Sequence, residues 1–149
     1  MKHKSKNYTF FAFAAMFSLL LVSASAAMAD GVSSANVKAV QLVINGHISA
    51  LKSGDYQSAY SFAAPNVKAA FPSAKIFISM VENGYKPLYH HSSYVFGKNT
   101  VSNGDVYQEI IVSDNTRKLW QFIYILSQQQ DQSWKITNVM MYPFEGSSV

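Results

Sequence analysis

The sequence contains no cysteine, and its charged residues make up only 13% of the chain. Disulfide bonds are therefore excluded, and so is the lipid-modified cysteine that anchors bacterial lipoproteins. No complete catalytic motif is present, and no His-x-x-x-His or carboxylate-histidine spacing indicates a metal site. The sequence thus predicts neither a cofactor nor a metal, and it does not identify a reaction.

The first 29 residues have the pattern of a secretory signal peptide. The first six residues include three lysines, and the apolar run Phe10–Ala24 follows. Ala27 and Ala29 then place small residues in the A-x-A arrangement before Asp30. The apolar run is short for the ~30 Å of hydrocarbon in a bilayer. We therefore expect cleavage between Ala29 and Asp30, no membrane anchor afterwards, and export to the periplasm or the medium.

Removal of this segment changes the charge of the protein. The full chain has 12 Lys and Arg against 8 Asp and Glu, and the three signal lysines reduce the basic count to nine. A nucleic-acid partner is not expected, because neutralising phosphates requires a basic patch. The remaining residues, 30–149, are enough for a single domain with its own core.

The first half of this domain has a helical pattern. Apolar residues recur every three or four positions between Val37 and Leu51, which predicts a helix that begins after Ser33 or Ser34 and ends at Gly54. Three shorter helices are predicted after it. Their first residues or caps are Asp55, Pro65 and Ser73, and the last helix closes at Gly84.

The second half has a strand pattern. Asn103-Gly104 lies between two apolar stretches, which is typical of a tight hairpin. The predicted strands are Tyr89–Val101, Val106–Ser113, Leu119–Gln128 and Trp134–Tyr142. Consecutive short turns favour an antiparallel meander. We therefore predict an α+β fold with N-terminal helices packed on one face of a curved four-stranded sheet.

Alternation along the last two strands assigns side chains to two faces. One face would carry Trp120, Phe122, Tyr124, Leu126, Trp134, Ile136, Asn138, Met140 and Tyr142, and we expect it to face the helices. The other face is also apolar, and a sheet with one solvated face should alternate apolar and polar residues. A homodimer through this outer face, centred on Ile123, Ile125, Val139 and Met141, is the expected explanation. The alternative is that residues 30–36 or strong curvature cover these side chains.

Several motifs resemble a known family. They are A-Y-x-F-A-x-P from Ala59 to Pro65, Phe71 with Phe77, G-Y-x-P-x-Y from Gly84 to Tyr89, Phe96-Gly97, Trp120 with Phe122 and Tyr124, and D-Q-S-W-K-I from Asp131 to Ile136. The chain resembles an uncharacterised family of mostly bacterial exported proteins, domain of unknown function family 4864, over about Ile48 to Tyr142. Gln132 replaces the family's usual glycine, so a wider turn is expected there.

This resemblance implies a fold similar to the nuclear-transport-factor-like, or cystatin-like, superfamily, in which a curved sheet wraps helices to form a cone. That superfamily includes isomerases, cyclases, dehydratases and many non-catalytic binding modules, so the fold does not determine the function. We expect a ligand pocket inside the cone. The candidate pocket residues are Tyr60, Tyr85, Tyr89, Trp120, Tyr124 and Asn138.

Two hypotheses for the function remain from the sequence. The first is a non-catalytic module whose apolar cone binds a small apolar ligand or a peptide. The second is a small cofactor-free enzyme, of isomerase or hydrolase type, that uses Asp55 or Glu109 with a tyrosine. A carboxylate deep in the cone, within reach of a tyrosine hydroxyl, would favour the enzyme. Carboxylates in solvent and an apolar cone would favour the module.

The individual polar residues also have structural interpretations. Asp55 suits a helix cap, and Glu109 is expected to point outward from its strand. His47 lies on the apolar stripe of the first helix and is expected at the edge of the core. His90 and His91 are neighbours, so a strand would direct them to opposite faces and they would not ligate one metal. Asn138 could orient a ligand or bond to a nearby tyrosine.

Overall fold

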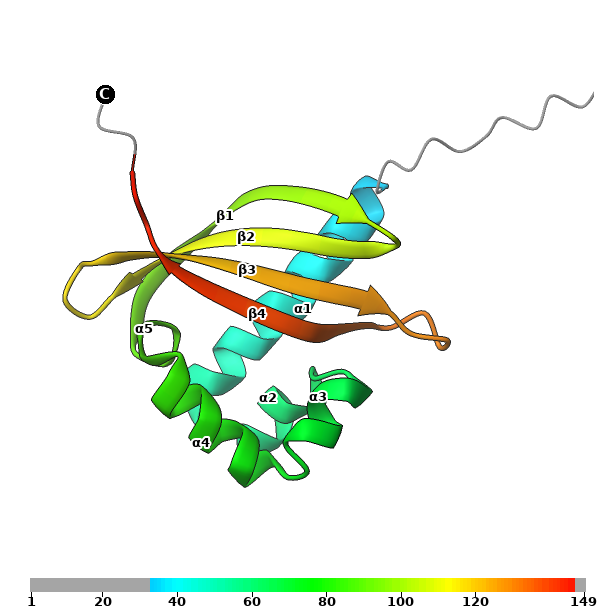
Figure 1. Ribbon diagram of the computed structural model, residues 1–149, viewed down its shortest axis with the longest axis horizontal. Coiled ribbons are helices and arrows are strands. Elements are labelled where there is room, and N and C mark those ends of the chain that lie inside the picture. The colour runs from blue at the N-terminus through cyan, green and yellow to red at the C-terminus, as the bar shows by residue number, and fades with distance from the viewer. Residues whose placement is uncertain (1–32, 147–149) are drawn as a thin grey trace, which may run out of the picture.

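The computed structural model describes residues 33–146, in which five helices precede a four-stranded sheet (Figure 1). The helices are α1 (Ser34–Ser53), α2 (Tyr56–Ser61), α3 (Pro65–Ala70), α4 (Ala74–Gly84) and α5 (Lys86–Tyr89). The strands are β1 (His91–Ser102), β2 (Asp105–Asp114), β3 (Leu119–Gln128) and β4 (Trp134–Pro143). The predicted signal peptide Met1–Ala29, with its cleavage site between Ala29 and Asp30, lies outside the described residues.

The helix ends follow from their capping residues. The side chains of Ser33, Asp55 and Ser73 each accept a hydrogen bond from the amide three residues ahead, as N-cap residues do. Gly54 ends α1 in the left-handed conformation, with φ of 74°. The four predicted helices are thus confirmed. The short α5 was not expected. Pro87 lies in its first turn, where the missing amide hydrogen of proline is tolerated.

The sheet is an antiparallel meander in the order β1-β2-β3-β4, as predicted. Asn103 and Gly104 connect β1 to β2 with φ of 52° and 84°, the two positive values that a type I′ turn requires. Gln132, in the β3–β4 turn, also adopts a positive φ of 65°. The α+β fold class predicted from the sequence is therefore correct.

The helices lie on one side of the sheet. Figure 1 shows α1 crossing behind the strands, while α2, α3 and α4 gather beyond the β4 edge. Burial along β2 alternates strictly, which identifies the covered face. Its buried residues are Val106, Gln108, Ile110, Val112 and Asp114. We call this helix-covered side the inner face and the opposite side the outer face.

A β-bulge in β4 corrects the predicted faces of that strand. Ile136 pairs with Leu126 and Asn138 pairs with Ile125, so one additional residue, Thr137, lies between consecutive pairs. An extra residue inverts the alternation of every side chain beyond it. The prediction that one uninterrupted face runs along β4 was therefore wrong.

The inversion moves residues between the two faces. Val139 and Met141 lie opposite Tyr124 and Phe122 and pack against the core, so they belong to the inner face. The side chains that share the outer face with Ile123 and Ile125 are Asn138, Met140 and Tyr142. The outer-face centre predicted from alternation is thus correct in β3 and wrong in β4.

The core lies between α1, α4 and the inner face. Its largest fully buried side chains are Tyr124, Phe122, Ile44, Ile48, Leu88, Ile110, Leu126 and Gln108. Gln108 is satisfied there, because its amide donates to the carbonyls of Gly97 and Lys98 and its oxygen accepts from Gln41. Within residues 33–146, no helix is long and apolar enough to cross a membrane.

Candidate functional site

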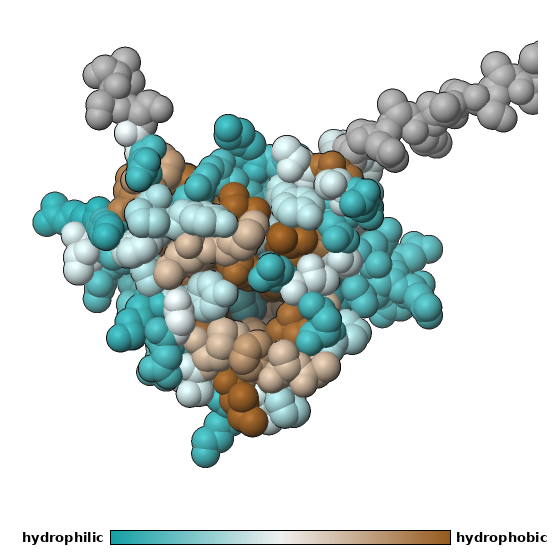
Figure 2. All heavy atoms as spheres, in the orientation of Figure 1, coloured by the Kyte–Doolittle hydropathy of each residue, from teal (hydrophilic) through white to brown (hydrophobic). Residues whose placement is uncertain are grey.

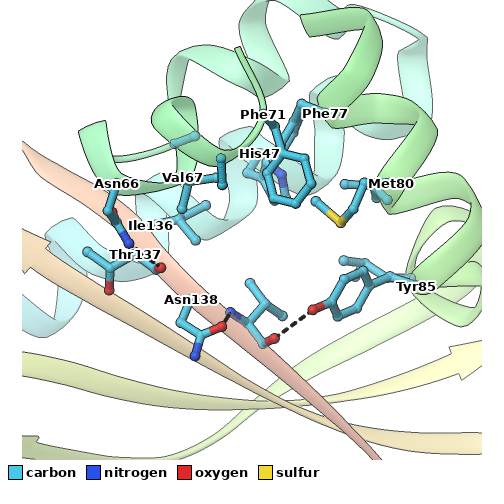
Figure 3. Close-up of a pocket in the computed structure, with 15 residues that line it drawn as sticks. His47, Asn66, Val67, Phe71, Phe77, Met80, Tyr85, Ile136, Thr137 and Asn138 are labelled. Carbon is cyan, nitrogen blue, oxygen red and sulfur yellow. Dashed lines mark hydrogen bonds between the residues drawn. The ribbon is translucent and has the colours of Figure 1, made fainter. Parts of the chain in front are cut away.

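A pocket of about 340 Å³ opens between the short helices and β4. Its walls come from α3, α4, the start of α5 and the bulged part of β4, and its residues are shown in Figure 3. In the space-filling view, this region is a hollow between the sheet and the helices below it (Figure 2). The volume is near the lower end of the range of about 300–1,000 Å³ typical of small-molecule sites.

Local pairing at one end of β4 positions the wall that faces α3. The amide of Ala64 donates to the carbonyl of Ile136, and the amide of Ile136 donates to Phe62. These bonds hold the start of α3 beside β4 immediately before the bulge at Thr137. Beyond the bulge, Val139 turns inward and lines the pocket. The bulge that inverts the strand therefore also shapes the site.

The pocket lining is mostly apolar. Its aliphatic, aromatic and thioether side chains are Ala63, Val67, Ala70, Phe71, Phe77, Met80, Val81, Leu88, Ile136 and Val139. The remaining lining residues are His47, Asn66, Tyr85, Thr137 and Asn138. Among residues 33–146, no Asp, Glu, Lys or Arg lines the pocket. An apolar wall with a few polar groups is typical of ligand sites.

His47 of α1 lies at the back of the pocket (Figure 3). Its side chain is only 3% exposed, and its Nδ1 lies 3.2 Å from the hydroxyl of Tyr124. Burial lowers the pKa of His47 to about 4 and raises the pKa of Tyr124, so both groups are neutral near pH 7. Within the described part of the chain, Nε2 of His47 is buried and has no hydrogen-bond partner.

Polar groups cluster at the mouth of the pocket, where they complete the backbone of the bulged strand. The amide of Asn66 donates to the carbonyl of Thr137 at 3.1 Å. The hydroxyl of Tyr85 donates to the carbonyl of Val139 at 2.9 Å, and Asn138 accepts from the amide of Val139 at 2.8 Å (Figure 3). These bonds fix the rim, and Asn138 is exposed there.

The structure brings together only some of the residues that the sequence suggested for the pocket. Tyr85 and Asn138 line it, and Tyr124 lies behind His47. Tyr60 packs against Phe77 from outside the pocket, and its hydroxyl donates to the backbone carbonyl of Phe71.

The other two suggested aromatics lie elsewhere. Tyr89 bonds to the hydroxyl of Tyr56 at 3.0 Å on the surface of the molecule. Trp120 borders a separate shallow hollow beside Pro87 and Met141, and its indole donates to Asp114. Trp120 is outside the pocket because β3 extends beyond the part of the sheet that α3 and α4 cover, and Tyr89 is outside it because it lies at the end of α5.

Neither candidate acid lies in the pocket. Asp55 is exposed at the start of α2, where bonds from the hydroxyl and amide of Ser58 lower the pKa of its carboxyl. Glu109 points to the outer face, as expected, and accepts from the amide of Lys98 and from the side chain of Gln121. Each carboxylate thus has a structural role where it lies.

The two adjacent histidines do not form a site together. His90 ends α5 and packs edge-on against Tyr89, whereas His91 begins β1 and contacts the carbonyl of Leu88 through Nδ1 at 2.7 Å. Burial lowers the pKa of His91. Among residues 33–146, no group of three or more His, Asp or Glu side chains could hold a metal ion.

Sequence reasoning underestimated His47. It was expected at the edge of the core, and the structure buries it completely behind the pocket. The available signal was its position on α1, because Ile44, His47, Ile48 and Leu51 form one continuous apolar stripe. A histidine in the middle of such a stripe must be desolvated, so it either finds partners or is left with an unpaired nitrogen.

Comparisons with known proteins agree with this geometry. Residues 33–149 match the model of a family described as domain of unknown function (DUF4864). An NTF2-like protein of unknown function from Methylobacillus flagellatus KT has a similar structure, with a TM-score of 0.54 and 13% identity over 74% of this chain and 93% of that chain. Another from Silicibacter pomeroyi DSS-3 has a TM-score of 0.51 and 13% identity over 73% and 96% of the two chains.

These similarities confirm the family resemblance and the nuclear-transport-factor-like fold that the sequence motifs suggested. The search of curated proteins gave no significant match. At 13% identity, the similar structures indicate the fold alone.

Proposed function

Because this chain belongs to the DUF4864 family, whose description assigns no activity, we propose a role from the pocket itself: the protein is a non-catalytic module that binds a small apolar molecule. The observation that carries this proposal is the buried, unpaired Nε2 of His47 at the back of an otherwise apolar pocket. A buried donor or acceptor without a partner costs free energy, and a bound ligand would recover it.

The size of the pocket favours a small molecule over a peptide. About 340 Å³ accommodates a ligand of up to about three aromatic rings, whereas a peptide needs a groove or a free strand edge along several residues. The β4 edge beside the pocket is partly occupied already. The backbone of Ile136 forms hydrogen bonds there with Phe62 and Ala64. The carbonyl of Val139 already accepts a hydrogen bond from the hydroxyl of Tyr85.

The enzyme alternative has less support. It required a carboxylate inside the cone near a tyrosine hydroxyl, and the two candidates, Asp55 and Glu109, lie at a helix cap and on the outer face. His47 would be a poor general base, since burial keeps its pKa at about 4. The binding module therefore accounts for more of the observed geometry.

Export is part of the proposal. The lysine-rich start, the apolar run and the A-x-A pattern before Asp30 support secretion to the periplasm or the medium. The intact mass of the protein recovered from these compartments tests it. A protein that begins at Asp30 is expected, and a cytoplasmic protein that retains Met1–Ala29 would contradict export.

A fluorescent probe tests the binding function with a matched pair of variants. N-phenyl-1-naphthylamine is neutral and becomes fluorescent in apolar sites. Ala69 and Ala70 are both exposed on α3, but only Ala70 lines the pocket. We expect Ala70→Trp to fill the pocket and weaken probe binding at least tenfold, while Ala69→Trp binds as the wild type does. No binding, or equal binding by all three proteins, would contradict the proposal.

A further inference from the structure

The tautomer of His47 follows from the partner of its Nδ1. Among the described residues, this nitrogen is the hydrogen-bond partner of the Tyr124 hydroxyl, at 3.2 Å. Tyr124 is completely buried, and a buried phenol needs an acceptor for its hydrogen. If Nδ1 carried the imidazole proton, the phenol hydrogen would have no acceptor. Tyr124 therefore donates to Nδ1, and the proton of the neutral ring lies on Nε2.

This assignment makes His47 a donor toward the pocket. Nε2–H is buried and has no partner within residues 33–146, and the imidazole is the one polar side chain at the back of the pocket. The other polar lining groups, Asn66, Tyr85, Thr137 and Asn138, come from α3, the end of α4 and β4 at the rim (Figure 3). A ligand thus meets apolar walls first and a single N–H donor at the far end.

The pocket offers nothing to stabilise a charged ligand. Among residues 33–146, no Lys or Arg lines it, so an anion would lose its hydration without gaining a cation. His47 does not supply the charge either, because burial holds its pKa at about 4. An ammonium group would meet another donor. Of the common polar groups, a neutral acceptor is the one that matches.

Resting on the proposed binding function, we infer that the natural ligand is a neutral apolar molecule with one carbonyl-class acceptor, which accepts a hydrogen bond from Nε2–H of His47. Tyr124 acts as a positioning residue that fixes the tautomer. Phe77 packs against the imidazole with ring centroids 6.1 Å apart, and Phe71 packs against Phe77 at 6.5 Å. Phe71 also lines the pocket and is partly exposed, so we expect it to move when a ligand reaches Nε2.

Three naphthalenes of nearly equal size test this inference by competition with N-phenyl-1-naphthylamine. We expect 2-acetylnaphthalene, a ketone, to bind about two- to tenfold tighter than 2-ethylnaphthalene, the range expected for one neutral hydrogen bond. The anion 2-naphthoate should bind most weakly. In His47→Leu, the advantage of the ketone should disappear while 2-ethylnaphthalene stays within about twofold of its wild-type affinity.

Tyr124→Phe provides a second variant if His47→Leu does not fold. Loss of the phenol frees Nδ1, both tautomers become accessible, and the preference for the ketone should shrink. Nitrogen-15 NMR of the wild-type imidazole reads the tautomer directly, and protonated Nε2 is expected. Protonated Nδ1, or equal affinity for the ketone and the hydrocarbon, would overturn the inference and leave the pocket proposal standing. Failure of the probe itself to bind would contradict the pocket proposal, and the inference with it.

Discussion

Both faces of the sheet carry isoleucine and aromatic side chains, yet helices cover only one of them within residues 33–146. Ile110 and Ile111 are neighbours in β2, and the first is fully buried while the second is part-exposed. The inner face and the helix α1 that packs on it bury the polar pair His47 and Tyr124. On the outer face, the carboxylate of Glu109 lies among apolar side chains and accepts a hydrogen bond from the amide of Lys98.

This difference shows that burial, and not residue type, decides what each face can do. On the inner face, an unpaired nitrogen is costly and can become a ligand contact. On the outer face, polar groups find partners within the sheet or in water. The isoleucines of that face form an apolar surface that a second copy of the chain could cover.

The largest expected effect comes from truncating matched isoleucines on the two faces. Ile110→Ala should destabilise the protein by about 2–5 kcal/mol, because it removes buried methyl groups and leaves a cavity. Ile111→Ala, one residue away, should cost about 1 kcal/mol or less in the monomer, because that side chain keeps contact with water. Urea denaturation at low protein concentration measures both. Equal losses would mean that the outer face is also covered.

The second prediction uses the pKa of His47, which burial lowers. Its pKa is about 4 in the folded protein against 6.5 for an unburied histidine, so the unfolded chain binds the proton first as the pH falls. Stability should therefore be highest above pH 6.5 and fall by about 2 kcal/mol by pH 5. The depressed pKa of His91 acts in the same direction.

A histidine variant separates this contribution from the others. His47→Gln should flatten the pH dependence of the unfolding free energy between pH 6.5 and 5, whatever its stability at neutral pH. His90→Gln, at an exposed position, is the control and should keep the wild-type slope. An unchanged slope in His47→Gln would show that His47 is not desolvated in solution.

The third prediction concerns association through the outer face. Four strands of about ten residues cover roughly 650 Å² per copy, at about 3.4 Å per residue and 4.8 Å between strands. Two copies would bury roughly 1,300 Å², near the lower limit for specific interfaces, so a weak homodimer is expected. The corrected centre of this surface is Ile123, Ile125 and Met140.

Light scattering and sedimentation at tens of micromolar measure the dimer. Ile123→Lys should raise its dissociation constant at least tenfold, because a charge would be buried at the centre of the interface. Leu42→Lys is the control, since Leu42 is 62% exposed on α1 and lies away from the sheet. A wild-type monomer at these concentrations, unchanged by Ile123→Lys, would rule out the dimer.

The sequence predicted the elements of this fold much better than its site. Caps such as Ser33 and Asp55 and the Asn103-Gly104 turn act locally, so their effects can be read from neighbouring residues. The bulge at Thr137 has no local signal, because it depends on how Ile136 pairs with the segment before α3. One inserted residue moved Asn138 outward and Val139 inward.

The pocket was predictable only in part for the same reason. Tyr85, a candidate from the sequence, lines it because its position at the end of α4 directs the ring toward β4. Tyr89 is only four residues further, but the unexpected turn of α5 places it on the surface. The contact between His47 and Tyr124 joins residues 77 positions apart, and only the packing of α1 on β3 brings them together.

The smallest expected effect concerns Gly97, where β1 carries a bulge on the outer face. The register shifts between Phe96 and Asn99, and the carboxylate of Glu109 lies directly over Gly97 and accepts from the amide of Lys98. A methyl group at Gly97 would collide with that carboxylate, which is the end of a flexible side chain and can move. Gly97→Ala should therefore cost about 1 kcal/mol, the value of one lost hydrogen bond.

In a Glu109→Ala background the collision is absent, so the same change should cost nearly nothing. This double-mutant cycle, measured by urea denaturation, isolates the contact between the two positions. If Gly97→Ala lowered the free energy of unfolding equally in both backgrounds, the destabilisation would come from the backbone of the bulge and not from the contact with Glu109.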